Sequence, residues 1–229
     1  VRVTVVPAGS DGVTEARDMI AAFRKETRLI AMVHASNVSG ALQPVDAVVA
    51  AARRRGILTL IDAAQTAGSV PIDLSSLPVD LLAASGHKGL LGPQGTGFLF
   101  VREGVPIVPL IEGGTGSRSE SDRQPEFFPD ALESGTRNSV GAAGLAVSLA
   151  WILRKGVGTI RRREVALVGL VLDGLARIPG ITVYGPASPA RRGAVVSFRV
   201  EGMDPAEVGA RLEKRSGVLV RAGLHCSPN

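Results

Sequence analysis

The chain has 229 residues, of which 45% are hydrophobic, so it can bury a substantial core. Only 3% of the residues are aromatic, which means that aliphatic side chains must form that core. The net charge of +5 raises the question of nucleic-acid binding, but the arginine triplets at 53–55 and 161–163 accompany neither zinc-finger spacing nor an RNA-binding aromatic motif. We therefore expect no nucleic-acid partner.

The cysteine content and the hydropathy pattern bear on the cellular compartment. Cys226 is the only cysteine, which excludes an internal disulfide in the chain. No signal-peptide pattern opens the sequence, and its longest nearly apolar stretch, 141–153, is too short to span a bilayer. These features favour a cytoplasmic protein with no membrane partner. Because the chain starts at Val1 within a strand-like run and stops three residues after Cys226, we expect both ends to be truncated.

The first half of the chain alternates apolar strand patterns with helical patterns. Strands are expected at 1–7, 29–34, 57–61, 79–84 and 97–101, and helices at 13–28 and 44–55. The strands are apolar throughout, which is typical of a parallel sheet covered on both faces. The predicted fold class is α/β, with a mostly parallel sheet between helices.

The second half of the chain begins with a long loop at 106–130, rich in Gly, Ser, Glu and Pro. The patterns that follow predict helices at 140–153 and on to about 178 with a bend at 156–158, strands at 181–184, 194–200 and 218–221, and a helix at 205–216. These elements indicate a smaller α+β unit. We predict two domains, 1–154 and 155–229.

Polar side chains follow three of the expected strands at the points where the strands end. They are His34 and Asn37 after the first, Asp62 and Gln65 after the second, and Ser85, His87 and Lys88 after the third. Parallel strands present their carboxyl ends at one edge of a sheet, where ligands bind in such folds. Each residue alone has an ordinary explanation as a cap or turn residue. A carboxylate, an amide, an imidazole and an amine together favour a functional site.

This combination suits pyridoxal phosphate. The cofactor needs a lysine for a Schiff base and an acidic partner for its pyridinium nitrogen. Lys88 lies where a strand meets a glycine-rich turn, and Asp62 suits the acidic role because an opposite charge keeps the nitrogen protonated. Gln65 could hydrogen-bond the phenolic oxygen, and Ser85 and His87 could hold the phosphate.

Four motifs in order resemble the class V aminotransferase superfamily, and within it the SufS-like cysteine desulfurases. The motifs are Ile61-Asp62-Ala63-Ala64-Gln65, Ser85-Gly86-His87-Lys88 with Gly92-Pro93-Gln94-Gly95-Thr96-Gly97, Glu133-Ser134-Gly135-Thr136-Arg137-Asn138, and Arg221-Ala222-Gly223-Leu224-His225-Cys226. The resemblance implies a large domain that binds pyridoxal 5'-phosphate, of the pyridoxal-phosphate-dependent transferase fold, and a smaller α+β domain.

The resemblance also implies roles for individual residues. Lys88 would carry the cofactor, Asp62 and Gln65 would contact its ring, and Asn37 would lie near cofactor and substrate. Thr136 would reach the cofactor phosphate of the neighbouring subunit, which implies a homodimer.

Cys226 distinguishes activities within the superfamily. A lone cysteine is normally an inert buried side chain, but Cys226 adjoins His225 and follows Arg221 by five residues, and positive neighbours favour the thiolate. The resemblance implies that L-cysteine is the substrate, that Cys226 takes its sulfur as a persulfide, and that alanine is released. The sulfur would pass to an acceptor protein or thiol. Arg221 would orient the loop or the substrate, or is an ordinary surface arginine.

The sequence departs from the family pattern in three places. It lacks the N-terminal stretch that supplies a phosphate-binding helix start and a ring-stacking residue, and it stops before the arginine that binds the substrate carboxylate. Leu224 stands where many relatives have a second histidine.

Three alternatives to a cysteine desulfurase stay open. The first is another class V activity, such as selenocysteine lyase, aminotransferase or epimerase. The second is a non-catalytic scaffold that binds a sulfur-transfer partner. The third is a metal site of His34, His87, His225 and Cys226, although their spacing matches no compact ligand pattern.

Overall fold

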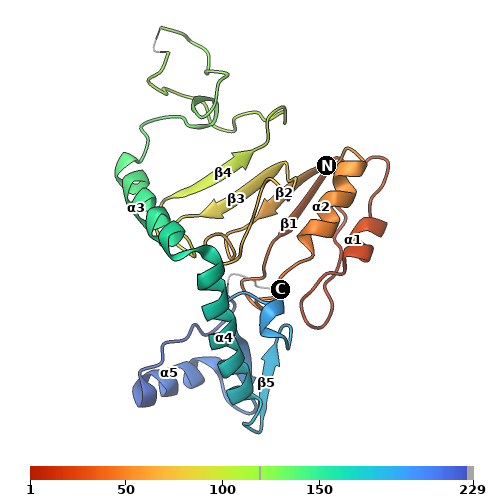
Figure 1. The fold of residues 1–229 in the computed structure, drawn as a ribbon, viewed down its shortest axis with the longest axis vertical. Coiled ribbons are helices and arrows are strands. Elements are labelled where there is room, and N and C mark those ends of the chain that lie inside the picture. Colours follow the sequence, from red (N-terminus) through yellow and green to blue (C-terminus); the bar gives the residue numbers. More distant parts are fainter. Residues whose placement is uncertain (119, 226–229) are drawn as a thin grey trace.

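The computed structural model describes residues 1–118 and 120–225, and a four-stranded sheet is its central element (Figure 1). The strands, in spatial order, are β1 (Leu29–Val33), β2 (Leu58–Asp62), β3 (Leu81–Ser85) and β4 (Gly97–Val101). The first three strands are parallel, and β4 runs antiparallel to β3. The predicted mostly parallel sheet is therefore confirmed, with β4 as the exception. The expectation that both faces are covered is wrong for the described residues, because buried and partly exposed residues alternate along β2 and β3, and no residue of β4 is buried.

Five α-helices occur in the described ranges 1–118 and 120–225. They are α1 (Ala16–Ala21), α2 (Val45–Arg54), α3 (Ser139–Lys155), α4 (Val157–Leu175) and α5 (Pro205–Ser216). Helix α2 forms the crossover between β1 and β2, and it ends before Gly56, whose φ of 64° suits a residue without a side chain. Asn138 caps the start of α3, since its side chain accepts a hydrogen bond from Gly141 N at 2.9 Å.

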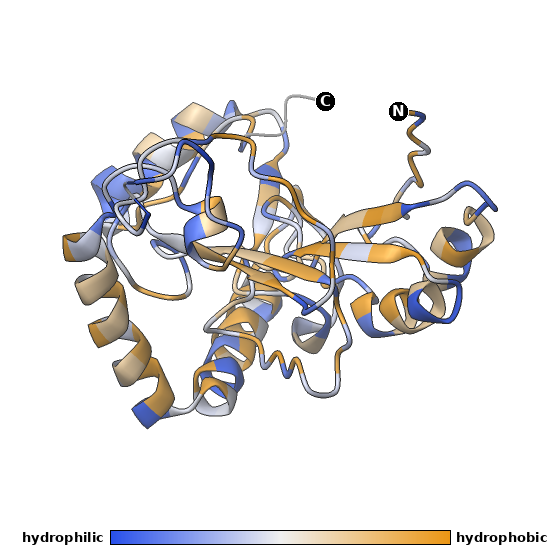
Figure 2. Ribbon diagram, turned by 90° about the horizontal axis from the view of Figure 1, so that it is seen from above, coloured by the Kyte–Doolittle hydropathy of each residue, from blue (hydrophilic) through white to orange (hydrophobic). Residues whose placement is uncertain are grey.

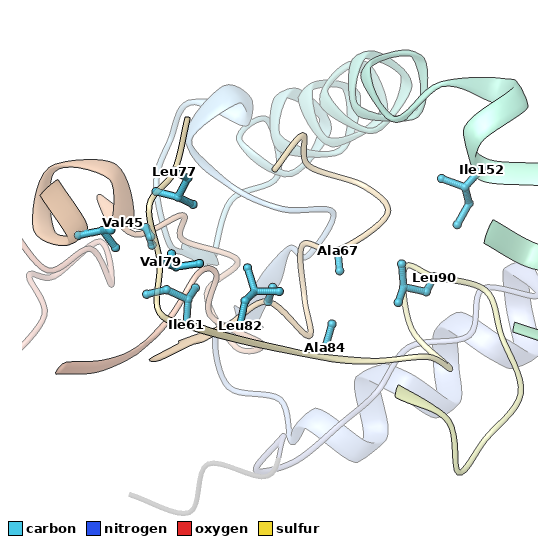
Figure 3. Close-up of a cluster of buried hydrophobic side chains, with 11 residues drawn as sticks. Val45, Ile61, Ala67, Leu77, Val79, Leu82, Ala84, Leu90 and Ile152 are labelled. Atoms are coloured by element: carbon cyan, nitrogen blue, oxygen red, sulfur yellow. The ribbon is translucent and has the colours of Figure 1, made fainter. Parts of the chain in front are cut away.

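One face of the sheet forms the main hydrophobic core (Figure 3). Ile61 and Leu82 lie beside each other in the register of β2 and β3, and both are buried. Val45 and Val49 of α2 cover them, and Ile152 of α3 joins the same cluster. Each such side chain contributes about 1.5–3 kcal/mol when fully buried. Figure 2 shows the strands as predominantly hydrophobic bands through the middle of the molecule.

A smaller unit follows the long loop. Strands β5 (Ile181–Tyr184) and β6 (Ser197–Val200) form an antiparallel pair, with α4 in contact with β5 and α5 in contact with β6. Helix α4 links this unit to the large sheet, since Val157 and Ile160 near its start pack on the main core (Figure 1). The domain division at residue 155 stays a prediction.

The predicted bend between the two long helices lies at Gly156, whose φ is 79°. Across residues 1–118 and 120–225, no helix by itself has the length and hydropathy needed to cross a membrane. Helices α3 and α4 pass that test only when taken together, and a bend of 78° separates them.

Two predicted elements near the N-terminus are wrong. Residues 1–7 form no strand, because an extended segment becomes a strand only when it pairs with a neighbour, and no described strand pairs with it. The helix predicted at 13–28 is confined to α1. The hydroxyl of Thr27 accepts a hydrogen bond from Arg24 N at 2.9 Å, which closes a turn in place of another helical turn.

Two predicted strands in the smaller unit also differ. The strand predicted at 194–200 is limited to β6, and residues 218–221 form no strand. Apolar β-type residues favour extended backbone at both places, but the ladder needs a partner of matching length. In β5 only four residues, Ile181–Tyr184, supply one.

Candidate functional site

The carboxyl ends of β1, β2 and β3 meet at one edge of the sheet. Val33 pairs with Asp62, and Asp62 pairs with Ala83, so the three strands end almost level. His34 N extends the first ladder by donating to Asp62 O at 2.8 Å. The antiparallel strand β4 starts at the same edge, because Ser85 pairs with Gly97. The predicted gathering of polar residues after these strands is therefore built into the register.

Lys88 lies in a tight turn between β3 and β4. Gly86 N donates to Thr96 O and Gly92 N donates to Gly86 O, both at 2.8 Å, so Gly86 closes both ends of the turn. A Cβ on Gly86 would collide with the Thr96 hydroxyl. The side chain of Lys88 is exposed at the top of this turn. Lys88 is thus an exposed residue on a turn whose backbone is held by two hydrogen bonds.

The Lys88 turn touches the segment that follows β2. A Cβ on Gly89 would lie 2.5 Å from Ala67 O, and a Cβ on Gly68 would collide with Gly89 O. Gly68 also has a φ of 87°, a backbone conformation that favours glycine. This backbone contact brings the Lys88 turn against the chain that has just passed through Asp62 and Gln65.

The chemistry of the donors at this edge fits pyridoxal phosphate. The Asp62 carboxylate is exposed, and one of its oxygens accepts a hydrogen bond from Ala64 N at 2.8 Å. No ion pair holds Lys88 among residues 1–118 and 120–225, so its amine is available. The Ser85 hydroxyl is buried and has no hydrogen-bond partner in that part of the chain, which is costly unless an acceptor binds beside it. Gln65 is half-buried and His87 exposed.

His34 supports this edge rather than facing outward from it. Its Nδ1 lies 3.0 Å from the hydroxyl of Thr66, which is fully buried. Burial lowers the pKa of His34, and the charge of Asp46 acts in the opposite direction. In the described ranges of the chain, no three His, Cys, Asp or Glu side chains gather as a metal site would require. His34 is a structural neighbour of the Asp62 segment.

The end of the described chain returns to the same edge. The side-chain amide of Asn37 donates to His225 O at 2.7 Å. His225 has a φ of 52°, in the left-handed region that residues other than glycine rarely adopt. Arg221 is exposed, and Cys226 lies outside the described residues. The motif at 221–226 is therefore in contact with the predicted site residue Asn37 through the His225 carbonyl.

Thr136 lies in the segment that leads into α3. It is exposed, and its neighbours 133–134 and 137–139 line a cleft of about 720 Å³ together with residues 95–97. Arg137 holds this segment through ion pairs with Asp130 and Glu133. Among the residues the structure describes, no hydrogen bond joins Thr136 to the sheet edge. Its role in a neighbouring subunit stays a prediction.

Some residues that shape the site carry no sequence signal. Thr66 is an ordinary threonine after the Asp62 motif, and only the fold brings it to His34. Arg192 stands in an arginine doublet that is typical of a surface, yet it is fully buried. Contacts across more than 150 residues place it beside the turn after β1.

A family model described as aminotransferase class V matches residues 1–229. A probable cysteine desulfurase of Methanothermobacter thermautotrophicus is 35% identical over 99% of this chain and 57% of its own length. A cysteine desulfurase of Pectobacterium atrosepticum is 34% identical over 99% of this chain and 56% of its own. The chain thus spans a little over half the length of these curated relatives.

Solved structures agree with this similarity. The apo structure of a cysteine desulfurase from Thermococcus onnurineus matches with a TM-score of 0.86 and 32% identity, over 98% of this chain and 56% of that one. A cysteine desulfurase from Escherichia coli, in an S-sulfonic acid form, matches with a TM-score of 0.83 and 25% identity, over 96% and 55% of the two chains.

Proposed function

Because the chain belongs to the class V aminotransferase family, which its match over residues 1–229 shows, we propose that its protein is a pyridoxal-phosphate-dependent cysteine desulfurase. The observation that carries this proposal is the backbone contact between Gly68 and Gly89, which sets the Lys88 turn against the Asp62–Gln65 segment. The relatives named as cysteine desulfurases support the choice of reaction.

The residues at the sheet edge would hold the cofactor as follows. Lys88 would bind it covalently, and the Asp62 carboxylate would keep its ring nitrogen protonated. Gln65 would donate to the ring's phenolic oxygen, and Ser85 and His87 would bind the phosphate. When bound, pyridoxal phosphate supplies a sink for the electron pair that is left on the substrate carbon.

The chain's own residues would divide the remaining work. L-cysteine would bind beside Asn37, and the amine of Lys88, once released, would move the α-proton. The thiolate of Cys226 would attack the substrate sulfur, so that an S–S bond forms while the carbon–sulfur bond breaks. The electron pair of that bond stays with the carbon, and its protonation yields alanine. Cys226 keeps the sulfur as a persulfide, and no external oxidant is needed.

The sequence before Cys226 supports its role as the nucleophile. Arg221 precedes it by five residues, and a positive charge near a thiol raises the fraction of thiolate. The persulfide would then pass its sulfur to an acceptor protein or a small thiol. We propose also that the protein is a homodimer in which Thr136 reaches the cofactor phosphate of the neighbouring subunit.

The test is a turnover assay on the full-length protein loaded with pyridoxal phosphate. We expect L-cysteine to yield equal amounts of alanine and transferable sulfur, Lys88→Ala to abolish both, and Cys226→Ala to lower both at least about 10-fold. Borohydride reduction should attach the cofactor to the peptide that contains Lys88. Lys25→Ala, which changes an exposed lysine, is the matched control.

Two results would contradict the proposal at different levels. Full activity in Lys88→Ala would exclude the whole reaction. Full alanine formation in Cys226→Ala, with Lys88→Ala inactive, would exclude the persulfide and leave another class V activity.

A further inference from the structure

The smaller unit donates hydrogen bonds to three successive backbone carbonyls of the turn that follows β1. The hydroxyl of Ser197 donates to Val38 O at 2.5 Å, and Nη2 of Arg192 donates to Ser39 O at 2.5 Å. Gly193 N donates to the next carbonyl, that of residue 40, at 2.8 Å. The three donors, Arg192, Gly193 and Ser197, are called the carbonyl clamp below. They come from a segment more than 150 residues away in the sequence.

Two glycines allow the backbones of the turn and of the smaller unit to approach each other closely. Gly40 has a φ of 74°, and a Cβ there would lie 2.6 Å from Val195 O. Gly185 has a φ of 92°, and a Cβ there would collide with Ser39 O. The backbones on both sides therefore touch directly. Such contact leaves the turn after β1 no room to slide against the smaller unit.

Arg192 is an unusual residue for a purely stabilising contact. Its side chain is fully buried, and its Nη2 also donates to Tyr184 O. In residues 1–118 and 120–225 its Nε and Nη1 have no hydrogen-bond partner and no carboxylate pairs with it. A buried guanidinium that uses so few of its five N–H groups is a weak source of stability, because its loss of hydration is poorly compensated. Because Nη2 of Arg192 binds two backbone carbonyls, the side chain is better suited to fixing the position of those backbones than to stabilising the fold.

The other end of the same turn carries Asn37. Its amide donates to His225 O, and His225 holds a left-handed backbone at the position before Cys226 in the sequence. Residues with a side chain adopt that conformation uncommonly, although histidine does so more often than most, so a contact that holds it matters. The hydrogen bond from Asn37 is such a contact, and it holds the His225 carbonyl.

We propose that the carbonyl clamp positions Asn37, and through Asn37 the His225 backbone, so that Arg192 and Ser197 are positioning residues for sulfur transfer from L-cysteine. This inference rests on the proposed function. The smaller unit would thus hold the His225 backbone at the cofactor edge, because it fixes the turn after β1 that carries Asn37.

The test uses the full-length protein and two readouts. Ser197→Ala removes one donor of the clamp, and Ser216→Ala, at the exposed end of α5, is the matched control. The first readout is the rate at which iodoacetamide alkylates the peptide containing Cys226 in cofactor-free protein. The second is kcat for L-cysteine, with the absorbance of bound cofactor as a check that the cofactor edge is intact.

We expect Ser197→Ala to change the alkylation rate by about 3- to 10-fold and to lower kcat by a similar factor. The absorbance of bound cofactor should stay unchanged. In an Asn37→Ala background, Ser197→Ala should have no further effect on alkylation. Arg192→Lys should act in the same direction as Ser197→Ala, and Arg191→Lys, which changes the exposed neighbour, should not.

Three outcomes would overturn the inference. They are an unchanged alkylation rate in Ser197→Ala, an equal effect in Ser216→Ala, and a full Ser197→Ala effect when Asn37 is already alanine. The alkylation experiment needs no turnover. It therefore tests the clamp even if the assay with Lys88→Ala contradicts the proposed function.

Discussion

Asp80, just before β3, is the centre of a buried polar network, and its replacement by asparagine should destabilise the sheet. The side chain accepts hydrogen bonds from Thr59 N at 2.7 Å and from the Thr59 hydroxyl at 2.9 Å on one oxygen. Its other oxygen accepts from Arg102 Nε at 3.0 Å and forms an ion pair with the same guanidinium. The network ties together the chain around β2, β3 and β4.

The size of the effect follows from the number of acceptors lost. Asparagine in place of Asp80 has one acceptor oxygen, so it can keep the bonds to Thr59 or those to Arg102, but not both sets. The side chain of Arg102 is 41% exposed, so water replaces its partner in part. A hydrogen bond to a charged group contributes about 1.5–3 kcal/mol. We expect Asp80→Asn to lower the free energy of unfolding by about 2–3 kcal/mol.

The pH dependence gives a second check. Burial acts to raise the pKa of Asp80, but the hydrogen bonds from Arg102 and Thr59 and the charge of Arg102 together outweigh it, so the pKa lies below its ordinary value. A carboxyl with a lowered pKa stabilises the fold above its ordinary pKa, about 3.9, and loses that contribution as the pH falls further. The difference in the free energy of unfolding between wild type and Asp80→Asn should therefore become smaller below about pH 4.

The assay is urea unfolding of the full-length protein, followed by circular dichroism at several pH values. Asp173→Asn, which changes an exposed aspartate on α4, is the control and should shift the midpoint little. A gap under about 0.5 kcal/mol at pH 7 would refute the reasoning, because it lies within the range of ordinary surface substitutions. A gap that widens as the pH falls would refute the assigned direction of the pKa.

Two further predictions concern the site. Burial lowers the pKa of His34, so the folded chain binds a proton there less readily than the unfolded chain does. The free energy of unfolding should therefore fall as the pH drops below about 6.5. His34→Gln should weaken that dependence, as measured by urea titrations at about pH 7.5 and pH 5. A dependence that His34→Gln leaves unaltered would assign it to other groups. Gly86→Ala should distort the Lys88 turn, because its Cβ would collide with the Thr96 hydroxyl, and should reduce covalent cofactor attachment as measured by borohydride trapping. Gly174→Ala, in open space on α4, should not, and equal trapping in both variants would contradict the role given to the turn.

Much of the sheet could be predicted from the sequence, because short apolar runs bounded by polar and glycine residues indicate strands. The runs at 29–34, 57–61 and 97–101 match β1, β2 and β4 closely. The direction of β4 could not be read in this way, since an apolar run looks the same in either orientation. Residues 13–28 show the opposite error: their amphipathic pattern predicts a long helix, but the hydroxyl of Thr27 closes a turn there through a local hydrogen bond.

The candidate site also has one part that the sequence predicts and another that only the tertiary structure shows. The order of strand ends and motifs, with Asp62 and Lys88 at the edge of a parallel sheet, follows from the sequence because the side-chain types and their spacing are local properties. Only the tertiary structure brought Gly89 onto Ala67, Thr66 onto His34, and the buried Arg192 onto the turn that carries Asn37. Contacts of this kind join segments tens to more than a hundred residues apart. They depend on how whole elements pack, and packing has no signature in a short stretch of sequence.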